Sequence, residues 1–419
     1  VYRSTETLFA SRTAGIFASF LLATSVSHIA LSSVARHWVP VSFLTALVLF
    51  LLVSPRFEPA KRYGIALMTA GLGMGISTVS ALLVIPIGLH FLFQRMWTIQ
   101  EAVRSQFLWA SSGIALFLAS LPSLLYPSSN GFVLDLTLKT PKGVVELLLS
   151  PLGTFKVLFP SEPVLIILAV LGLILAFRRH RQIFYTAVLW LSAYATIFFI
   201  LFRFETRFFL PMIVVCVILG GYACSVLALE AKRFGRVALF ALLLLPLACA
   251  VQVAWLATGN DTRVTARDWA LAHIAPGERG IVYANIMRVP TTAGAIAELR
   301  SIDPKALRTV DGAEERIART DLPHILNIYS VTDTSFFARL PTYAADEGYQ
   351  YLIVDPAFIE SDLERAPYFR ALIASSTEIA SWDGLEPTAF SASSFPEPFW
   401  HLFSGERFGP DIKVYRLTP

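Results

Sequence analysis

The sequence predicts a multi-pass helical membrane unit followed by a small α/β unit outside the membrane. Three observations predict it. The 419 residues are 55% apolar and only 15% charged, whereas soluble domains usually carry about 25% charged residues. Long apolar runs fill the first part of the chain and end near Leu256. Residues 1–256 contain 19 basic and 8 acidic residues, whereas residues 257–419 contain 15 and 22, so the two parts suit different environments.

The composition also excludes several classes of protein and site. It does not fit a collagen, a coiled coil or a disordered chain. The three cysteines lie inside apolar runs, which argues against a disulfide framework. The seven histidines show no metal-binding spacing, and the chain has no P-loop and no Gly-x-Ser-x-Gly elbow. No cofactor is therefore indicated, and a need for a divalent metal ion stays open.

The first half of the chain supplies the predicted spans. A spanning helix needs roughly 20 apolar residues. Seven runs are candidates: Thr13–Ala35, Trp38–Ser54, Phe107–Tyr126, Pro163–Phe177, Ile183–Phe202, Phe208–Leu229 and Val237–Leu256. The stretch Tyr63–Phe93 is too long for one span, so we expect a hairpin of two short helices that turns near Ser77–Thr78. The total is about nine crossings.

Basic loops give the predicted orientation, because Lys and Arg are enriched on the cytoplasmic side. The richest short loops are Arg56–Arg62, Arg95–Arg104, Arg178–Arg181 and Lys232–Arg236. When these loops are placed on the cytoplasmic side, the parity of the predicted crossings puts the residues after Leu256 on the outer side of the membrane. We therefore expect a protein of the cytoplasmic (inner) membrane with an extracytoplasmic C-terminal unit, residues 257–419.

The second half alternates helical and strand patterns, which is typical of an α/β layer. Asn260 and Asp261 precede a helical pattern and predict a capped start. The expected helices are Thr262–Ile274, Phe336–Glu347 and Ser361–Ala374, and the expected strands are Gly280–Ala284, Tyr349–Asp355, Glu378–Trp382 and Ile412–Leu417. The stretch Gly384–Gly409 is expected to be a loop.

The strongest candidate site is a short outer turn, Arg203-Phe-Glu-Thr-Arg207. Two guanidinium groups held there could bind a phosphate, and Glu205 could orient one of them. Short outer loops normally avoid arginine, so two arginines in this turn run against the topology rule. The alternative is that both arginines reach toward the lipid headgroups.

Weaker candidates lie in two other outer segments. Arg36 could contact a lipid phosphate, and His37 could move a proton. Lys139 and Lys142 could attract an anionic headgroup. The alternative for all four is ordinary placement at the membrane interface.

Two other patterns have simpler interpretations. Gly71-Leu-Gly-Met-Gly75 resembles part of a dinucleotide fingerprint, but it lies in an apolar helix and is better explained as a packing face. Arg178–Arg181 is best explained as a topological anchor, so no nucleic-acid partner is indicated.

The order of these features resembles the polytopic C-type glycosyltransferases, in particular the bacterial dolichyl-phosphate-mannose–protein mannosyltransferase-like enzymes of family 39. Three segments match this pattern: the span start Arg207-Phe-Phe-Leu-Pro211, the Gly-rich hairpin from Gly64 to Pro86, and Ser27–Arg36 before an outer turn. The resemblance covers most of residues 1–256 and extends to the remainder only in layout.

This resemblance implies transfer of a sugar from a polyprenyl-phosphate carrier to a lipid, glycan or protein acceptor at the outer face. Arg203 and Arg207 would bind the carrier phosphate, with membrane lipids around them. The family's catalytic acidic pair lies in an outer loop that would precede Val1, so no base is named here. We expect an N-terminally truncated chain that is inactive alone.

Two other functions stay open at this point. One is a transporter or flippase for a lipid-linked glycan, although only one interrupted segment, Tyr63–Phe93, is present and transporters often show matching halves. The other is a non-catalytic membrane protein whose outer unit binds a partner.

Overall fold

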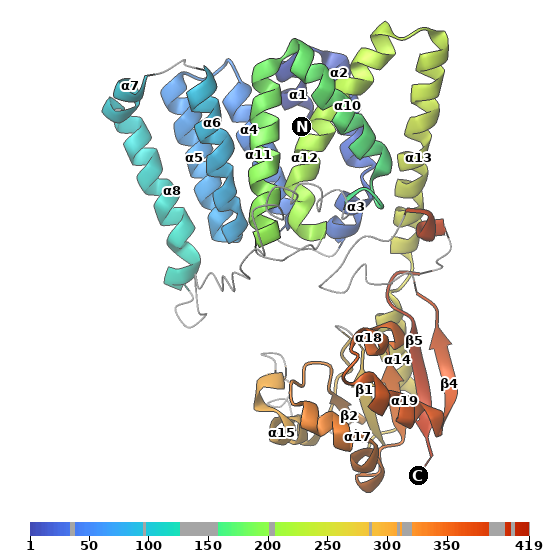
Figure 1. The fold of residues 1–419 in the computed structure, drawn as a ribbon. Coiled ribbons are helices and arrows are strands. Elements are labelled where there is room, and N and C mark those ends of the chain that lie inside the picture. The colour runs from blue at the N-terminus through green and yellow to red at the C-terminus, as the bar shows by residue number, and fades with distance from the viewer. Residues whose placement is uncertain are drawn as a thin grey trace. The chain divides into compact units, whose positions relative to one another are not determined.

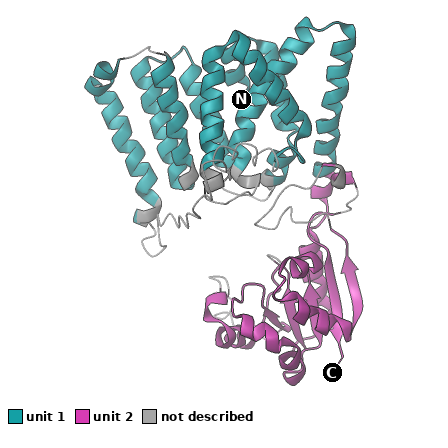
Figure 2. Ribbon diagram, in the orientation of Figure 1, with its two compact units in different colours: residues 1–254 teal, residues 255–419 magenta. Residues whose placement is uncertain are grey.

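The computed structural model divides the chain into two compact units, Val1–Ala254 and Trp255–Pro419 (Figure 1, Figure 2). The described residues are 1–33, 38–94, 98–125, 158–200, 206–284, 287–307, 311, 321–384, 399–403 and 407–418. Each unit contains its own clusters of buried apolar side chains. The predicted helical unit followed by a small α/β unit is confirmed at this level.

Unit 1 is helical in its described parts. Its helices are α1 (Tyr2–Phe9), α2 (Arg12–Ala23), α3 (Val26–Ser33), α4 (Trp38–Val53), α5 (Pro59–Ile76), α6 (Val84–Gln94), α7 (Ile99–Arg104), α8 (Gln106–Leu125), α10 (Pro163–Arg179), α11 (Arg181–Ile200), α12 (Thr206–Glu230) and α13 (Arg233–Thr258). A 3₁₀ turn, η1 (Thr78–Leu83), joins α5 to α6.

The predicted spans coincide with these helices, with one clear difference. The run Thr13–Ala35 is not one helix, because the chain breaks between α2 and α3 at Thr24 and Ser25. The Thr24 hydroxyl donates to the carbonyl of Phe20 at 2.9 Å, a local bond that competes with helix continuation. The expected hairpin turn is confirmed, because α5 ends at Ile76 and Ser77 is its extended cap.

Two helices among the described residues are long and apolar enough to cross a membrane. One is Phe209–Glu230, nearly all of α12. The other begins at Arg233, and its apolar part is α13. The α12 segment is mostly buried among other helices, whereas the second is mostly exposed. Association with a membrane is therefore indicated by length and composition, while nine crossings stay a prediction.

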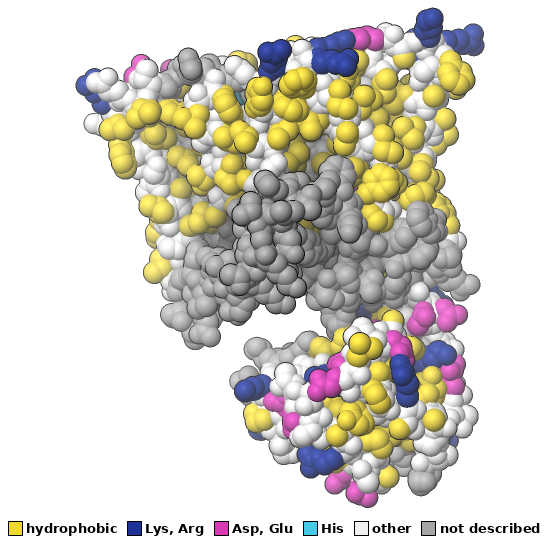
Figure 3. Space-filling model, viewed as in Figure 1, with side chains coloured by type: hydrophobic (Ala, Val, Ile, Leu, Met, Phe, Trp, Pro, Cys, Tyr) yellow, Lys and Arg dark blue, Asp and Glu magenta, His cyan; other side chains and the backbone are white. Residues whose placement is uncertain are grey.

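Apolar and basic side chains occupy different parts of the surface of unit 1. Figure 3 shows apolar side chains over the sides of its helices and Lys and Arg gathered at one end. The turn from α10 to α11 and the turn from α12 to α13 share that end, because Arg179 and Glu230 form an ion pair at 2.5 Å. This basic end contains Arg178–Arg181 and Lys232–Arg236, which the sequence assigns to the same side of the membrane.

The helices of unit 1 approach closely at small residues. A Cβ atom added to Gly172 of α10 would lie 2.0 Å from the carbonyl oxygen of Leu219 in α12. One added to Gly71 of α5 would lie 2.4 Å from the carbonyl oxygen of Ala115 in α8. These contacts are typical of small-residue interfaces between apolar helices. The packing interpretation is therefore confirmed for Gly71.

Unit 2 is built on a five-stranded sheet with the order β2-β1-β3-β5-β4. Its strands are β1 (Arg279–Tyr283), β2 (His324–Asn327), β3 (Tyr351–Val354), β4 (Ser376–Trp382) and β5 (Ile412–Leu417). Its helices are α14 (Thr262–His273), α15 (Ala293–Ile302), α17 (Thr334–Asp346), α18 (Pro356–Ser361) and α19 (Ala366–Ala374), with short 3₁₀ turns at Pro304–Ala306 and Phe399–Phe403. β1 pairs in parallel with β2 and β3, while β5 is antiparallel to β3 and β4.

The sequence predicts most of unit 2. The cap of α14 is confirmed, because the Asp261 carboxylate accepts from the backbone N–H of Arg263 at 2.8 Å. The expected helix Ser361–Ala374 is wrong in its first part, since α18 ends at Ser361 and Asp362 begins a new turn by accepting from the N–H of Arg365. Most of the expected loop Gly384–Gly409, residues 385–398, lies outside the described residues.

We predict that Gly71→Ala destabilises unit 1, whereas Gly113→Ala does not. The new Cβ at position 71 would meet backbone of α8, which cannot rotate away, and such overpacking costs about 1–3 kcal/mol. Gly113 has no heavy atom within 4 Å of an added Cβ, so alanine there gains helix propensity of up to about 1 kcal/mol. Thermal unfolding of the purified chain in detergent tests this pair. Equal melting temperatures for the two variants would contradict the prediction.

Candidate functional site

Six of the seven site residues predicted from the sequence lie outside the described part of the chain. They are Arg36, His37, Lys139, Lys142, Arg203 and Glu205. Arg207 is described only in its backbone, which forms the first turn of α12. The structure therefore neither brings these side chains together nor separates them.

The structure nevertheless describes several residues around the start of α12. Helices α10 and α12 run in the same direction, because the Arg179–Glu230 pair joins their last residues. The start of α10 therefore shares an end of unit 1 with the start of α12. Phe209 and Leu210 of α12 are buried there in one cluster with Leu158. This end is the one that the sequence assigns to the outer face.

Glu162 is a buried carboxylate at this end. It precedes Pro163 of α10 and is 4% exposed. Its Oε1 accepts from the Ser25 hydroxyl at 2.7 Å and from the backbone N–H of Ser27 at 2.8 Å. Ser27 lies in the first turn of α3, where a negative charge is favourable. Glu162 thus ties the break between α2 and α3 to the start of α10.

The sequence does not single out Glu162, because this residue lies just outside the predicted span that begins at Pro163. A signal was present, since Glu162 stands alone among apolar neighbours directly before a predicted span. Charged groups are expensive in such positions and are kept only where they have hydrogen-bond partners. Glu162 therefore positions neighbouring segments, because its Oε1 accepts hydrogen bonds from Ser25 and Ser27.

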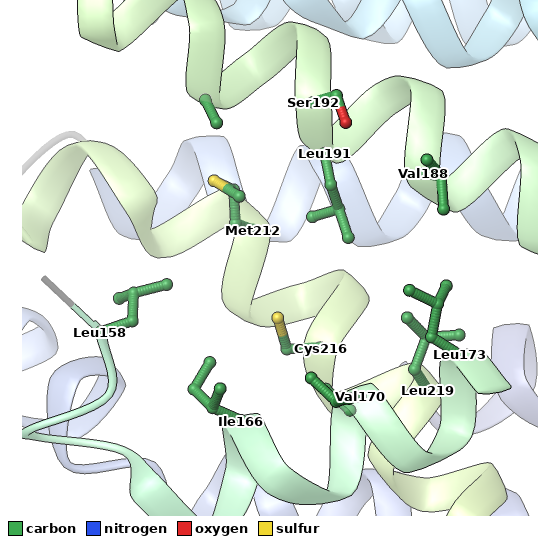
Figure 4. Close-up of a pocket in the computed structure, with 12 residues that line it drawn as sticks. Leu158, Ile166, Val170, Leu173, Val188, Leu191, Ser192, Met212, Cys216 and Leu219 are labelled. Carbon is green, nitrogen blue, oxygen red and sulfur yellow. The ribbon is translucent and has the colours of Figure 1, made fainter. Parts of the chain in front are cut away.

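An apolar cavity of about 200 Å³ lies between α10, α11 and α12 (Figure 4). Leu158 and Ile166, four residues on either side of Glu162, line it together with Met212 and Cys216 of α12. Ser192 is the one hydroxyl-bearing side chain among its lining residues. Such a lining suits an apolar chain rather than a sugar or a phosphate.

Unit 2 contains a polar cluster around Glu298 of α15. Its carboxylate accepts from Arg279 at 2.7 Å, lies 2.8 Å from His324 Nε2, and accepts from the hydroxyls of Tyr343 and Tyr349. Burial alone would raise the pKa of Glu298, but these hydrogen bonds and the charge of Arg279 outweigh it and lower the pKa to about 2. The cluster therefore holds an ionised carboxylate.

The Glu298 cluster has a structural role. Arg279 and His324 begin β1 and β2, so the cluster lies at the amino ends of the parallel strands. Ligands of open α/β sheets bind at the opposite, carboxyl ends. The cluster joins α15 and α17 to the sheet through hydrogen bonds among five side chains.

The carboxyl ends of the same strands hold two buried polar residues. The Asn327 side chain accepts from the Val289 N–H at 3.1 Å and donates to its carbonyl at 3.0 Å. Asp355 follows β3 and accepts from the N–H of Phe358, capping α18. Burial raises the pKa of Asp355 to about 6. Both residues bond to backbone of unit 2, which explains their burial without a ligand.

No group of three or more His, Cys, Asp or Glu side chains able to hold a metal ion occurs among the residues that the structure describes. No family model matches the chain, and searches of curated proteins and of solved structures find no match. The function is therefore argued from the chain itself.

We predict that Glu162→Ala destabilises unit 1 by about 1–3 kcal/mol, because the Ser25 hydroxyl and the Ser27 N–H lose their buried acceptor. Glu162→Gln keeps an amide oxygen at this position and is expected to lose less. Glu58→Ala is the control, since its side chain is 75% exposed and pairs only at the surface with Lys61. Melting temperatures in detergent measure the effect, and a Glu58→Ala loss as large as that of Glu162→Ala would refute it.

We predict that Glu298 stabilises unit 2 at neutral pH and loses this effect on acidification. Its folded-state pKa is lowered to about 2, so the contribution is full above the ordinary Glu pKa of about 4.3 and fades as pH falls from there toward 2. Glu298→Gln should therefore flatten the pH dependence of unfolding between pH 5 and pH 2. Glu364→Gln, at an exposed position, is the control. Parallel curves for wild type and Glu298→Gln would rule out this role.

Proposed function

We propose that the protein is a membrane glycosyltransferase. It moves a sugar from a polyprenyl-phosphate carrier to a lipid, glycan or protein acceptor on the outer face of the cytoplasmic membrane. One observation carries the proposal: the segment Arg207–Pro211 forms the first turns of α12, a long apolar helix that is mostly buried in unit 1. Arg207 thus belongs to a helix start within the unit rather than to a loose surface loop.

The distribution of basic residues supports the orientation. The basic end of unit 1 contains the last residues of α10 and α12, and Lys and Arg are enriched on the cytoplasmic side. In this orientation α12 begins at the outer face and α13 returns toward it, so that unit 2 follows on the outside. The proposed topology has about nine crossings, including the α5–α6 hairpin.

The proposed chemistry needs cations and a base. Breaking the bond between the sugar and the phosphate leaves negative charge on the carrier phosphate. Arg203 and Arg207 would stabilise that charge, and the N–H groups at the start of α12 would add to the positive potential. The acceptor hydroxyl must lose a proton to a carboxylate. Glu162 holds Ser25 and Ser27, so we assign it to positioning α3 and name no base among the described residues.

We predict that Arg207→Ala lowers sugar transfer from a labelled polyprenyl-phosphate sugar by roughly 10²-fold, the usual cost of removing one group that stabilises developing charge. Arg207→Lys should retain part of the activity because it keeps the charge. The control is Arg178→Ala, an exposed arginine at the basic end.

The assay is made in native membranes that contain the protein, with photo-crosslinking of the same donor as a second readout. Loss of both crosslinking and transfer in Arg207→Ala supports the proposal. Wild-type transfer by both Arg203→Ala and Arg207→Ala would contradict it. Movement of the intact donor across the membrane without sugar transfer would instead favour a lipid-linked glycan transporter.

A further inference from the structure

A second cavity, of about 540 Å³, lies at the basic end of unit 1. It is bordered by α1, by the end of α4, by α5 and α6, and by the turn between α10 and α11. Six of its twelve lining residues have nitrogen-containing side chains, and none of the twelve is acidic. These polar residues are Arg62, His90, Arg179, His180, Arg181 and Gln182.

Three described acidic side chains near the cavity form ion pairs with basic residues. Glu230 accepts from Arg179 at 2.5 and 2.8 Å, which also fixes that guanidinium in place. Glu6 pairs with Arg3 and Glu58 with Lys61, both outside the lining. Arg62, Arg179 and Arg181 all line this concave space, where the potential of like charges is focused.

Arg62 is unusual in its burial. Only 5% of it is exposed, and its Nη2 donates to the carbonyl of Phe57 at 3.1 Å. Its placement in the cavity lining adds a positive charge to the wall of that cavity. Arginine is also the residue that binds phosphate bidentately.

The cationic cavity continues into an apolar chamber. Six of its lining residues also line a chamber of about 90 Å³, among them His90 and Gln182. Beyond them the chamber is bordered by apolar side chains such as Pro86, Trp190 and Ile218. His90 lies at the junction, with its Nδ1 3.0 Å from the Tyr63 hydroxyl. The space is therefore cationic at one end and apolar at the other.

We infer that this space binds a phosphate group carried on an apolar tail. The phosphate would bind between Arg62, Arg181 and His90, and the first part of the tail would enter the apolar chamber. The site lies at the opposite end of α12 from Arg207, so it does not rest on the proposed sugar transfer. In the predicted orientation it faces the cytoplasm, and the ligand is a phospholipid or a polyprenyl phosphate of the inner leaflet.

Two sources can supply this chemistry, a lipid headgroup or a soluble phosphate compound. Three probes distinguish them with the purified full chain in an uncharged detergent: fluorescent short-chain phosphatidic acid, the matching diacylglycerol without phosphate, and inorganic phosphate as competitor. The proposal expects saturable binding of phosphatidic acid that weakens with added salt, and little binding of diacylglycerol.

Arg181→Gln and Arg62→Gln are the test variants, and each should weaken phosphatidic acid binding about tenfold or more, the usual effect of losing one charged hydrogen bond. Arg181 is exposed, so its substitution keeps the test valid if the buried Arg62 variant does not fold. Arg178→Gln is the matched control, because Arg178 lies three residues from Arg181 and does not line the cavity.

The binding results distinguish support for the proposed site from its failure. Loss of binding in Arg181→Gln with wild-type binding in Arg178→Gln supports the site. Inorganic phosphate that binds as tightly as phosphatidic acid would overturn the lipid part of the proposal. Diacylglycerol that binds as tightly as phosphatidic acid, or an equal loss in Arg181→Gln and in the control Arg178→Gln, would overturn the site altogether. Sugar transfer is not measured here, so failure of this site leaves the transferase proposal unaffected.

Discussion

The close contact of α12 with its neighbours is the constraint on which the rest of unit 1 depends. Gly172 of α10 touches the backbone of α12 at Leu219, and Gly221 of α12 touches α2 at Ala18. No side chain larger than hydrogen fits at either glycine without moving a helix. Because α10 and α12 are held this closely and run in the same direction, one end collects Arg178–Arg181 and the other collects the starts of both helices.

This arrangement gives the two ends different chemistry. At one end the Glu162 carboxylate is buried and bonded within the chain, so it stiffens the break between α2 and α3. At the other end Arg62 is buried against a cavity that water-sized molecules can enter. The first charge is hydrogen-bonded to Ser25 and Ser27, whereas the second lies in the wall of a cavity. Burial alone therefore does not mark a functional charge; the surroundings of the charged atoms decide.

The sequence predicts the helices of unit 1 well because apolar length is a strong signal. It misses the break at Thr24 and Ser25, because the apolar pattern continues across it and because Glu162, which bonds to Ser25 and Ser27, lies far along the chain. It also misses β2, since His324–Asn327 is only four residues long and has polar ends. The strand is fixed by pairing with β1, a long-range contact that no local pattern contains.

The sequence does not predict the cationic cavity for a similar reason. Arg62, His90 and Arg181 are far apart in the chain, and the basic loops that hold Arg62 and Arg181 have a sufficient local explanation as topological anchors. Only packing of α5, α6 and α11 places them around one space. The predicted outer candidates, Arg203 and Glu205 among them, lie outside the described residues and stay predictions.

The cavities also bear on the choice between a transferase and a transporter. The chamber behind the cationic cavity and the cavity between α10, α11 and α12 have one lining residue in common, Leu219. Leu219 is buried, and its carbonyl is the atom against which Gly172 packs. A headgroup moving between these two cavities would have to pass between α11 and α12, the two helices that line both, beside Leu219. A transporter needs its pathway to open in turn from both sides, whereas a transferase needs its helices to stay in place around the reacting groups. The buried Leu219 between the two cavities therefore favours separate lipid-phosphate sites at the two ends over a single route between them.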